Sequence, residues 1–164
     1  MTNVIAMQQR AGLEVATDAP DGGPSIVFCS HCGARPESEV FSRVCESCGM
    51  GLLLEADEQT APPEGGAFLV IDSSMSICAV SAAAERLLAT RETDSVNSHL
   101  TQLIVPADAE AQGAANLAVA VTWAVRGDQK TRKVFVRPTN TFGVRMTARI
   151  ATCGPPRAAL VVFD

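Results

Sequence analysis

Residues 29–49 read CSHCG-ARPESEVFSRV-CESCG and contain four of the six cysteines in the chain. Each CxxC pair lets two thiolates reach one ion from a tight turn. Gly33 and Gly49 follow the second cysteine of each pair, and glycine allows the left-handed backbone that folds amide groups back over the sulfurs. Two such knuckles make a closed tetrahedral site, which is typical of structural zinc, and the predicted ligands are Cys29, Cys32, Cys45 and Cys48.

Other interpretations of the four cysteines are weaker. Four thiolates also suit iron in a rubredoxin-like site, but the twelve-residue spacer between Cys32 and Cys45 is short for it. Disulfides are disfavoured because we expect no signal peptide and therefore a reducing cytoplasm. A catalytic zinc needs an open position for water, which a fourth thiolate occupies. His31 could replace one thiolate ligand, although a solvated knuckle residue is the simpler interpretation.

The residues around the knuckles are β-prone and few. Residues 26–28 enter the first knuckle, residues 38–44 precede the second, and residues 51–54 leave it. A ribbon of about thirty residues has too little apolar surface to fold unaided, so bound metal would contribute about 10 kcal/mol or more. The pattern resembles the zinc-ribbon family over residues 26–55.

Composition favours a folded chain with more than one domain. The 164 residues are 47% hydrophobic, which excludes global disorder and leaves about a hundred residues beyond the ribbon. The formal net charge of −5 gives no general attraction to nucleic acid, which we therefore do not expect as a partner. The sequence has no apolar span typical of a membrane segment, so we expect a cytoplasmic protein without a membrane partner.

Two segments have the composition of linkers. Residues 1–25, with Asp-Ala-Pro-Asp-Gly-Gly-Pro at 18–24, predict a flexible N-terminal segment, in which residues 4–13 could form a short helix. Residues 56–66 are rich in proline and glycine and predict a linker between the ribbon, 26–55, and a second domain, 67–164. We therefore expect loss of the metal site to leave the second domain largely folded.

The second domain predicts a definite order of strands and helices. Residues 67–71 and 76–80 form a hairpin, after which Ser81 caps a helix over 82–88 that carries Glu85 near its start. The remaining predicted elements are a partly helical stretch at 93–103, a helix from 107 or 108 to about 126, and strands at 131–137, 142–152 and 158–163.

This order resembles the PAS family over residues 67–164, through FLVID at 68–72, AVSAAAERLL at 79–88, LIVPAD at 103–108 and ALVVFD at 159–164. Ser81 stands where the family commonly has Asn, and Asn97 and Ser98 stand where a Gly is usual. The resemblance implies an α+β domain with a five-stranded antiparallel sheet and helices on one face. It also implies a sensory or interaction module, with or without a haem, flavin or small metabolite.

The residues of the second domain do not identify a cofactor. A flavin photosensor of this family would need an Asn-Cys-Arg motif, and haem would generally need a His on the helix at 107–126; the sequence has neither. His99 is the one histidine of the domain and fits a surface or capping residue better than a haem ligand. Cys78 and Cys153 are interpreted as buried thiols rather than as a redox pair. Trp123 is expected to fill the core rather than to gate a cavity.

No catalytic constellation is recognisable, so the sequence predicts a protein that is not an enzyme. We favour a cytoplasmic sensory or regulatory module that binds structural zinc and signals through ligand binding or protein association. One alternative is a transcription-associated protein whose ribbon contacts nucleic acid or polymerase. The charge balance of the ribbon disfavours phosphate contact, because it has two arginines, Arg35 and Arg43, and four acids, Glu37, Glu39, Glu46 and Glu55. Another alternative is a redox sensor in which the metal site itself responds.

Basic residues are concentrated late in the chain. Asp128 is the one acid between residues 126 and 149, which hold seven of the thirteen basic residues: Arg126, Lys130, Arg132, Lys133, Arg137, Arg145 and Arg149. A solvated basic face is one interpretation. The sharper interpretation is that this face binds an acidic surface, such as the ribbon of the same or a neighbouring chain.

Two predicted strands are apolar on both faces. Residues 142–151 alternate and leave one wet face, whereas 67–71 and 158–163 do not alternate. The PAS resemblance makes these two runs adjacent central strands with helices on one side, so an apolar patch should remain on the other. Residues 4–13, residues 52–54 or a second copy could cover it. We favour a homodimer through the sheet, with Phe68, Val70, Val161 and Phe163 in the patch.

Overall fold

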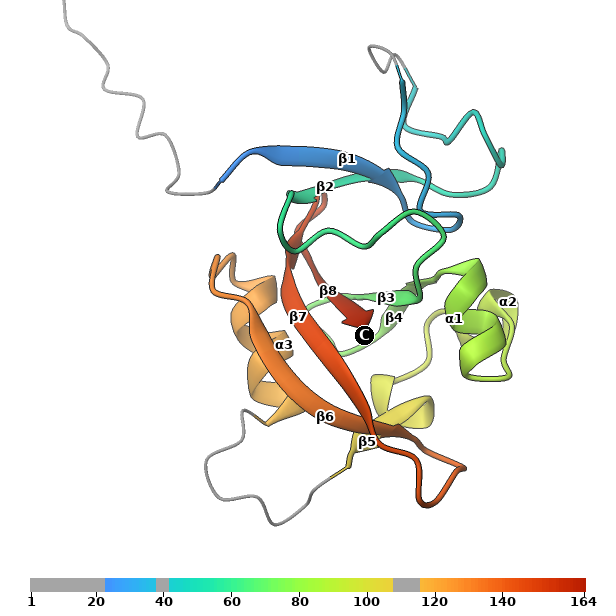
Figure 1. Ribbon diagram of the computed structural model, residues 1–164, viewed down its shortest axis with the longest axis vertical. Helices are drawn as coiled ribbons and strands as arrows, with labels where there is room; N and C mark the ends of the chain where they lie inside the picture. Colours follow the sequence, from blue (N-terminus) through green and yellow to red (C-terminus); the bar gives the residue numbers. More distant parts are fainter. Residues whose placement is uncertain (1–22, 38–41, 108–115) are drawn as a thin grey trace, which may run out of the picture.

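The computed structural model describes residues 23–37, 42–107 and 116–164 (Figure 1). The helix considered at 4–13 lies outside these residues, as do most of the predicted N-terminal segment and part of the predicted strand at 38–44. The elements in the described part are β1 (Ser25–Cys29), β2 (Leu53–Asp57), β3 (Phe68–Ile71), β4 (Ile77–Val80), α1 (Ala82–Leu87), α2 (Glu92–Ser95), the 3-10 helix η1 (Leu100–Gln102), β5 (Ile104–Pro106), α3 (Leu117–Val125), β6 (Arg132–Pro138), β7 (Met146–Cys153) and β8 (Ala158–Phe163).

The larger sheet is antiparallel with the strand order β4-β3-β8-β7-β6-β5. The predicted adjacency of the two apolar runs is confirmed, because β3 pairs with β8 from Phe68 opposite Val162 to Ile71 opposite Ala159. The predicted count of five strands is wrong by one. The additional strand is β5, in which Ile104 pairs with Pro138 of β6. It was missed from the sequence because it directly follows residues 93–103, which were expected to be partly helical.

The helices cover one face of this sheet, as the resemblance implied. The core on that side joins Leu69 of β3, Val161 of β8 and Ile150 of β7 to Ala84 of α1 and Val121 of α3. All five side chains are buried. This face therefore holds the main core of the larger sheet.

Both longer helices begin at side-chain caps. The Oγ of Ser81 accepts a hydrogen bond from the backbone N–H of Ala84, which confirms the predicted cap of α1. Asn116 caps α3, which begins at Leu117. The helix was expected to begin at 107 or 108; residue 107 is not helical, and residues 108–115 lie outside the described part of the chain.

The opposite face of the larger sheet is covered by the ribbon. A second apolar core joins Phe28 of β1 and Leu54 of β2 to Phe68 of β3 and to Leu160 and Val162 of β8. The ribbon, which was one of three candidate covers, therefore occupies the patch on which the expected sheet-face homodimer rested. Two residues assigned to that patch face the other way, because Val161 and Phe163 pack with the helical core.

The segment predicted as a linker is part of the folded structure. Ala56 belongs to β2, and Thr60 and Ala61 are buried. Glu55 also exchanges two backbone hydrogen bonds with Gly154 at the end of β7, which joins the two sheets directly. The apolar core and this backbone bridge make the ribbon a covering layer of the larger sheet rather than a tethered unit.

Several side chains lie differently from their predicted places. Trp123 of α3 is 44% exposed at the surface, with the guanidinium carbons of Arg126 and Arg132 5.8 and 5.7 Å from its ring centroid. Ala118 of the same helix is also exposed. The strand predicted from residue 142 begins at Met146, and Phe142 projects from the preceding turn. None of the helices in the described part of the chain has the length and apolar character needed to cross a membrane.

Candidate metal centre

The four cysteine sulfurs of the ribbon converge on one point. The Sγ atoms of Cys29, Cys32, Cys45 and Cys48 all lie within 4.8 Å of one another. Cys29 is 3.7 Å from Cys48 and Cys32 is 3.8 Å from Cys45, sulfur to sulfur. A tetrahedral ion with metal–sulfur bonds of about 2.3 Å separates its ligands by about 3.8 Å. The geometry therefore fits one tetrahedrally coordinated metal ion.

Two tight turns bring the sulfurs together. In the first, the N–H of Gly33 donates to the carbonyl of Cys29 at 3.0 Å; in the second, the N–H of Gly49 donates to the carbonyl of Cys45 at 2.8 Å. Both glycines have positive φ, +72° and +66°, as the CxxCG pattern predicts. Backbone N–H groups point at the sulfurs, with those of His31 and Cys32 3.3 and 3.5 Å from Cys29 Sγ. Such donors stabilise thiolate ligands.

Gly51 allows the two knuckles to approach each other. A Cβ at this position would lie 2.2 Å from the sulfur of Cys29 and 2.8 Å from the backbone nitrogen of His31. The carbonyl of Gly51 accepts from the N–H of Cys45 at 2.8 Å, and Ser30 exchanges hydrogen bonds with Leu52. The start of β2 thus fits against the first knuckle only because residue 51 has no side chain.

Without a cation, the thiols of this cluster ionise unequally. Burial raises the pKa of the Cys29 thiol to about 12 and also raises the pKa of Cys32. Burial acts in the same direction on Cys48, but backbone N–H donors and the neighbouring thiols outweigh it and lower its pKa to about 6. Ionisation of one sulfur opposes ionisation of the next, so four thiolates at this spacing require a bound cation.

The alternatives raised by the sequence can be compared with this geometry. All six cysteines are free thiols, and sulfur separations of 3.7 and 3.8 Å are far longer than a disulfide bond. His31 is not among the converging groups. The set has four sulfurs and no oxygen or nitrogen donor, which suits zinc or iron and leaves no open position for catalysis.

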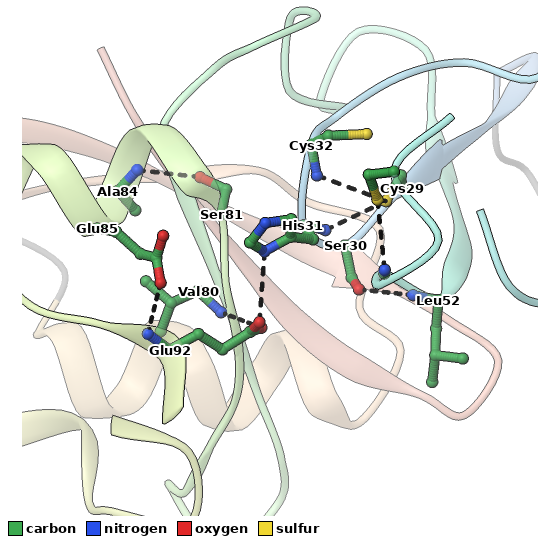
Figure 2. Close-up of polar contacts among 12 residues, drawn as sticks. Cys29, Ser30, His31, Cys32, Leu52, Val80, Ser81, Ala84, Glu85 and Glu92 are labelled. Carbon is green, nitrogen blue, oxygen red and sulfur yellow. Dashed lines mark hydrogen bonds and ion pairs between the residues drawn. The ribbon is translucent and has the colours of Figure 1, made fainter. Parts of the chain in front are cut away.

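His31 instead connects the first knuckle to the helices of the larger sheet (Figure 2). Its backbone carbonyl accepts from the N–H of Ala82, the first residue of α1, at 2.8 Å. Its ring Nδ1 is buried and lies 3.3 Å from a carboxylate oxygen of Glu92, but the pair does not meet the geometry of a hydrogen bond. The other carboxylate oxygen of Glu92 accepts from the N–H of Val80 at 3.0 Å. The residue between two of the converging cysteines thus contacts α1 and α2 directly, which the expectation of a solvated side chain missed.

The remaining candidates lie apart from the four cysteines. His99 is exposed at the start of η1, where its Nδ1 accepts from the N–H of Thr101, so it has the capping role expected of it. Cys153 is buried, as predicted, but Cys78 is exposed. Burial raises the pKa of Cys153 to about 12, which makes this thiol a poor nucleophile.

The basic side chains of the ribbon are few and partly engaged. Arg43 donates to the carbonyl of Pro155 at 2.7 Å, which turns it toward the β7–β8 connection. Arg35 lies in the same hollow as Glu37, Glu46 and Glu64. This surface does not offer the clustered positive charge that phosphate contact requires.

Comparisons with known proteins give a limited result. No protein-family model matches the chain, and a search of curated proteins finds no match. Among solved structures, the chain is similar to the crystal structure of the PAS domain of nitrogen regulation protein NR(II) from Vibrio parahaemolyticus, with 20% sequence identity and a TM-score of 0.44. The similarity covers 60% of this chain and 86% of that chain.

Proposed function

We propose that the protein is a cytoplasmic sensory or regulatory module whose four-cysteine site holds structural zinc and whose larger sheet acts as a PAS-type sensing or interaction domain. The strand order and the helices on one face of the sheet support the PAS-type assignment. The convergence of four sulfurs supports the metal. The proposal assigns no chemical reaction to the protein.

We assign zinc rather than iron because a closed site of four thiolates on two CxxC turns is typical of structural zinc. The ligands lie on two turns with few apolar contacts of their own, so the metal must contribute a large part of the local stability. A closed four-thiolate site also protects a zinc ion from water and substrate. Metal analysis together with the absorption spectrum separates the two ions, because iron–thiolate centres absorb visible light and zinc centres do not.

One observation carries the regulatory part of the proposal. The knuckle that supplies Cys29 and Cys32 also holds His31 against α1 and Glu92 of α2. Release of the metal frees both cysteines and would loosen the backbone between them. The contacts with Ala82 and Glu92 then weaken, so the metal state of the ribbon and the position of these helices are energetically coupled, and the coupling acts in both directions.

Hydrogen exchange in the zinc-loaded and the chelated protein tests this coupling. We expect chelation to speed amide exchange in the segment from Val80 to Ser95, which contains α1 and α2, by at least tenfold. The amides of α3 report any loss of stability of the whole fold, so exchange over Val80 to Ser95 should accelerate more than exchange in α3. His31→Ala should produce part of the same effect with zinc still bound, and His99→Ala is the matched control because the exposed side chain of His99 bonds within its own turn.

Two results would contradict the proposal. Unchanged exchange over Val80 to Ser95, with the ribbon amides opened by chelation, would remove the link between the metal and the helices. Less than half an equivalent of zinc in protein purified from its own cytoplasm would remove the metal itself.

A further inference from the structure

The charges of the chain are strongly segregated. Eight of the thirteen basic residues lie between Arg126 and Arg157, with Asp128 as the one acid in that stretch, whereas sixteen of the eighteen acids precede residue 126. Asp128 pairs with Arg132 at 2.7 Å, and the C-terminal Asp164 pairs with Arg149 at 2.9 Å. The two acids of the late part of the chain are therefore already engaged with basic partners.

The turn between β6 and β7 presents a basic and aromatic surface. Phe142 is 84% exposed and Phe135 is also exposed, and an arginine lies over each ring. The guanidinium carbon of Arg145 is 3.8 Å from the ring centroid of Phe135, and that of Arg137 is 5.0 Å from that of Phe142. The residues of this hairpin surface are Lys133, Phe135, Arg137, Phe142, Val144 and Arg145.

The ribbon of the same chain does not cover the hairpin surface. The second apolar core, between ribbon and sheet, takes residues from β3, β4, β7 and β8 and none from β6. Along β6, Val134 and Val136 are buried toward the helices, so Lys133 and Phe135 point to the opposite, uncovered face. Exposed aromatic and arginine side chains are the types enriched at the centres of protein interfaces.

The ribbon carries a surface of the complementary kind. Met50 is 68% exposed, and the neighbouring Val44 and Leu52, which form a β-bridge, are also exposed. Glu37 and Glu46 are exposed and line one hollow with Val44, in which they and Glu64 outnumber the single base, Arg35. This ribbon surface, defined by Glu37, Val44, Glu46, Met50 and Leu52, therefore combines exposed apolar side chains with acids.

We propose that the hairpin surface of one chain binds the ribbon surface of a second copy of the same chain. Every copy carries both surfaces. Both expose apolar side chains, and the hairpin surface is basic whereas the ribbon surface is acidic. A two-fold arrangement forms the contact twice and satisfies both surfaces of each copy. Charge complementarity favours a second copy over a nucleic acid, because the remaining surface of the chain is acidic and repels a polyanion.

Sedimentation velocity over a range of protein and salt concentrations is the first test. We expect a dimer at tens of micromolar in low salt that dissociates as salt is raised, because salt screens charges over distances comparable to such a contact. Lys133→Glu should weaken the dimer by at least tenfold, and so should Glu37→Lys. Arg86→Glu makes the same change of charge as Lys133→Glu on exposed α1 and should leave the dimer intact.

A charge swap gives the decisive measurement. The Lys133→Glu and Glu37→Lys proteins should each dimerise at least tenfold more weakly than the wild type, yet form a tighter mixed dimer when combined, because both contacts in the mixture again join opposite charges. Recovery on mixing also shows that neither variant is misfolded. A monomeric wild-type protein at low salt, a dimer indifferent to both substitutions, or no recovery on mixing would each overturn the proposal. Binding of a single-stranded oligonucleotide that requires Lys133, by a protein that stays monomeric, would overturn it in favour of nucleic acid.

Discussion

The ring of Phe28 in the ribbon stands edge-on to the ring of Phe68 in β3, with centroids 5.6 Å apart and planes at 85°. Both side chains are completely buried. Edge-to-face aromatic pairs add about 0.5–1.5 kcal/mol to the effect of burial alone. This pair lies between the two sheets, so the ribbon and the larger sheet share one apolar core. They do so although the composition of residues 56–66, which connect them, suggests a linker.

Truncation of Phe28 measures how much this shared core contributes. We expect Phe28→Ala to lower the free energy of unfolding by about 3–5 kcal/mol, because a large buried side chain is lost and a cavity is left. The measurement is urea denaturation of the zinc-loaded protein. Phe142→Ala removes the same side chain from an exposed turn and, measured in high salt where the proposed dimer is dissociated, should change stability by less than about 0.5 kcal/mol. Equal effects of the two substitutions would contradict the packing described for Phe28.

The metal site was the part of the structure most accessible to prediction. The CxxCG repeat specifies both the cysteines that converge and the left-handed glycines that follow them, and φ is positive at Gly33 and at Gly49. These features depend on local backbone geometry, which nearby residues determine. The contact between His31 and Glu92 joins residues sixty-one positions apart, and no local pattern encodes it.

The layers of the sheet were predictable in part. Strands apolar on both faces indicate that both faces are covered, which is correct for β3 and β8. The pattern does not say what covers them, because a ribbon and a second copy bury the same side chains. Trp123 was misplaced for a similar reason: its apolar ring suggests the core, whereas it is exposed and two arginines lie over it.

Removal of the metal should affect the whole fold. The sequence alone suggests that Cys45→Ser would unfold the ribbon and spare residues 67–164. The shared core instead predicts that this variant, or chelation of the wild-type protein, exposes Phe68 and Leu160 and lowers the thermal midpoint of the entire chain. Calorimetry with and without chelator measures this effect. A sheet that melts at an unchanged temperature without zinc would show that the two parts fold independently.

Gly51 should be intolerant of any side chain. A methyl group at this position would collide with the sulfur of Cys29 and with the backbone of His31, so we expect Gly51→Ala to lower zinc affinity by at least tenfold. Competition with a chromogenic chelator measures the affinity. Gly65→Ala is the control, because Gly65 has positive φ but a methyl carbon there would meet no atom within 4 Å, so the change adds backbone strain without a collision. Equal zinc affinities would mean that the knuckles can move apart freely.

Cys78 and Cys153 should differ in reactivity. Cys78 is exposed, although partial burial of its thiol and the nearby Asp72 raise its pKa, so its alkylation should accelerate steadily as pH rises toward that pKa. Cys153 is buried with a pKa of about 12 and should react only after unfolding. Mass spectrometry of zinc-loaded protein treated with iodoacetamide should therefore find one label, on Cys78. A disulfide between the two thiols under mild oxidation would instead support a redox pair.

We expect Ser81, at the N-terminus of α1, to contribute strongly to the stability of the fold. Its buried Oγ accepts from the N–H of Phe68 at 2.9 Å and from that of Ala84 at 3.2 Å, and donates to the carbonyl of Gly66 at 3.0 Å. Ser81→Ala removes the helix cap and leaves the N–H of Phe68 without this acceptor in a place closed to water. We expect a loss of about 2–3 kcal/mol in the free energy of unfolding. Ser74→Ala, in an exposed turn, is the matched control and should be nearly neutral. A loss below about 0.5 kcal/mol for Ser81→Ala would mean that water replaces the hydroxyl, and amide exchange at Phe68 would then rise while global stability stayed constant.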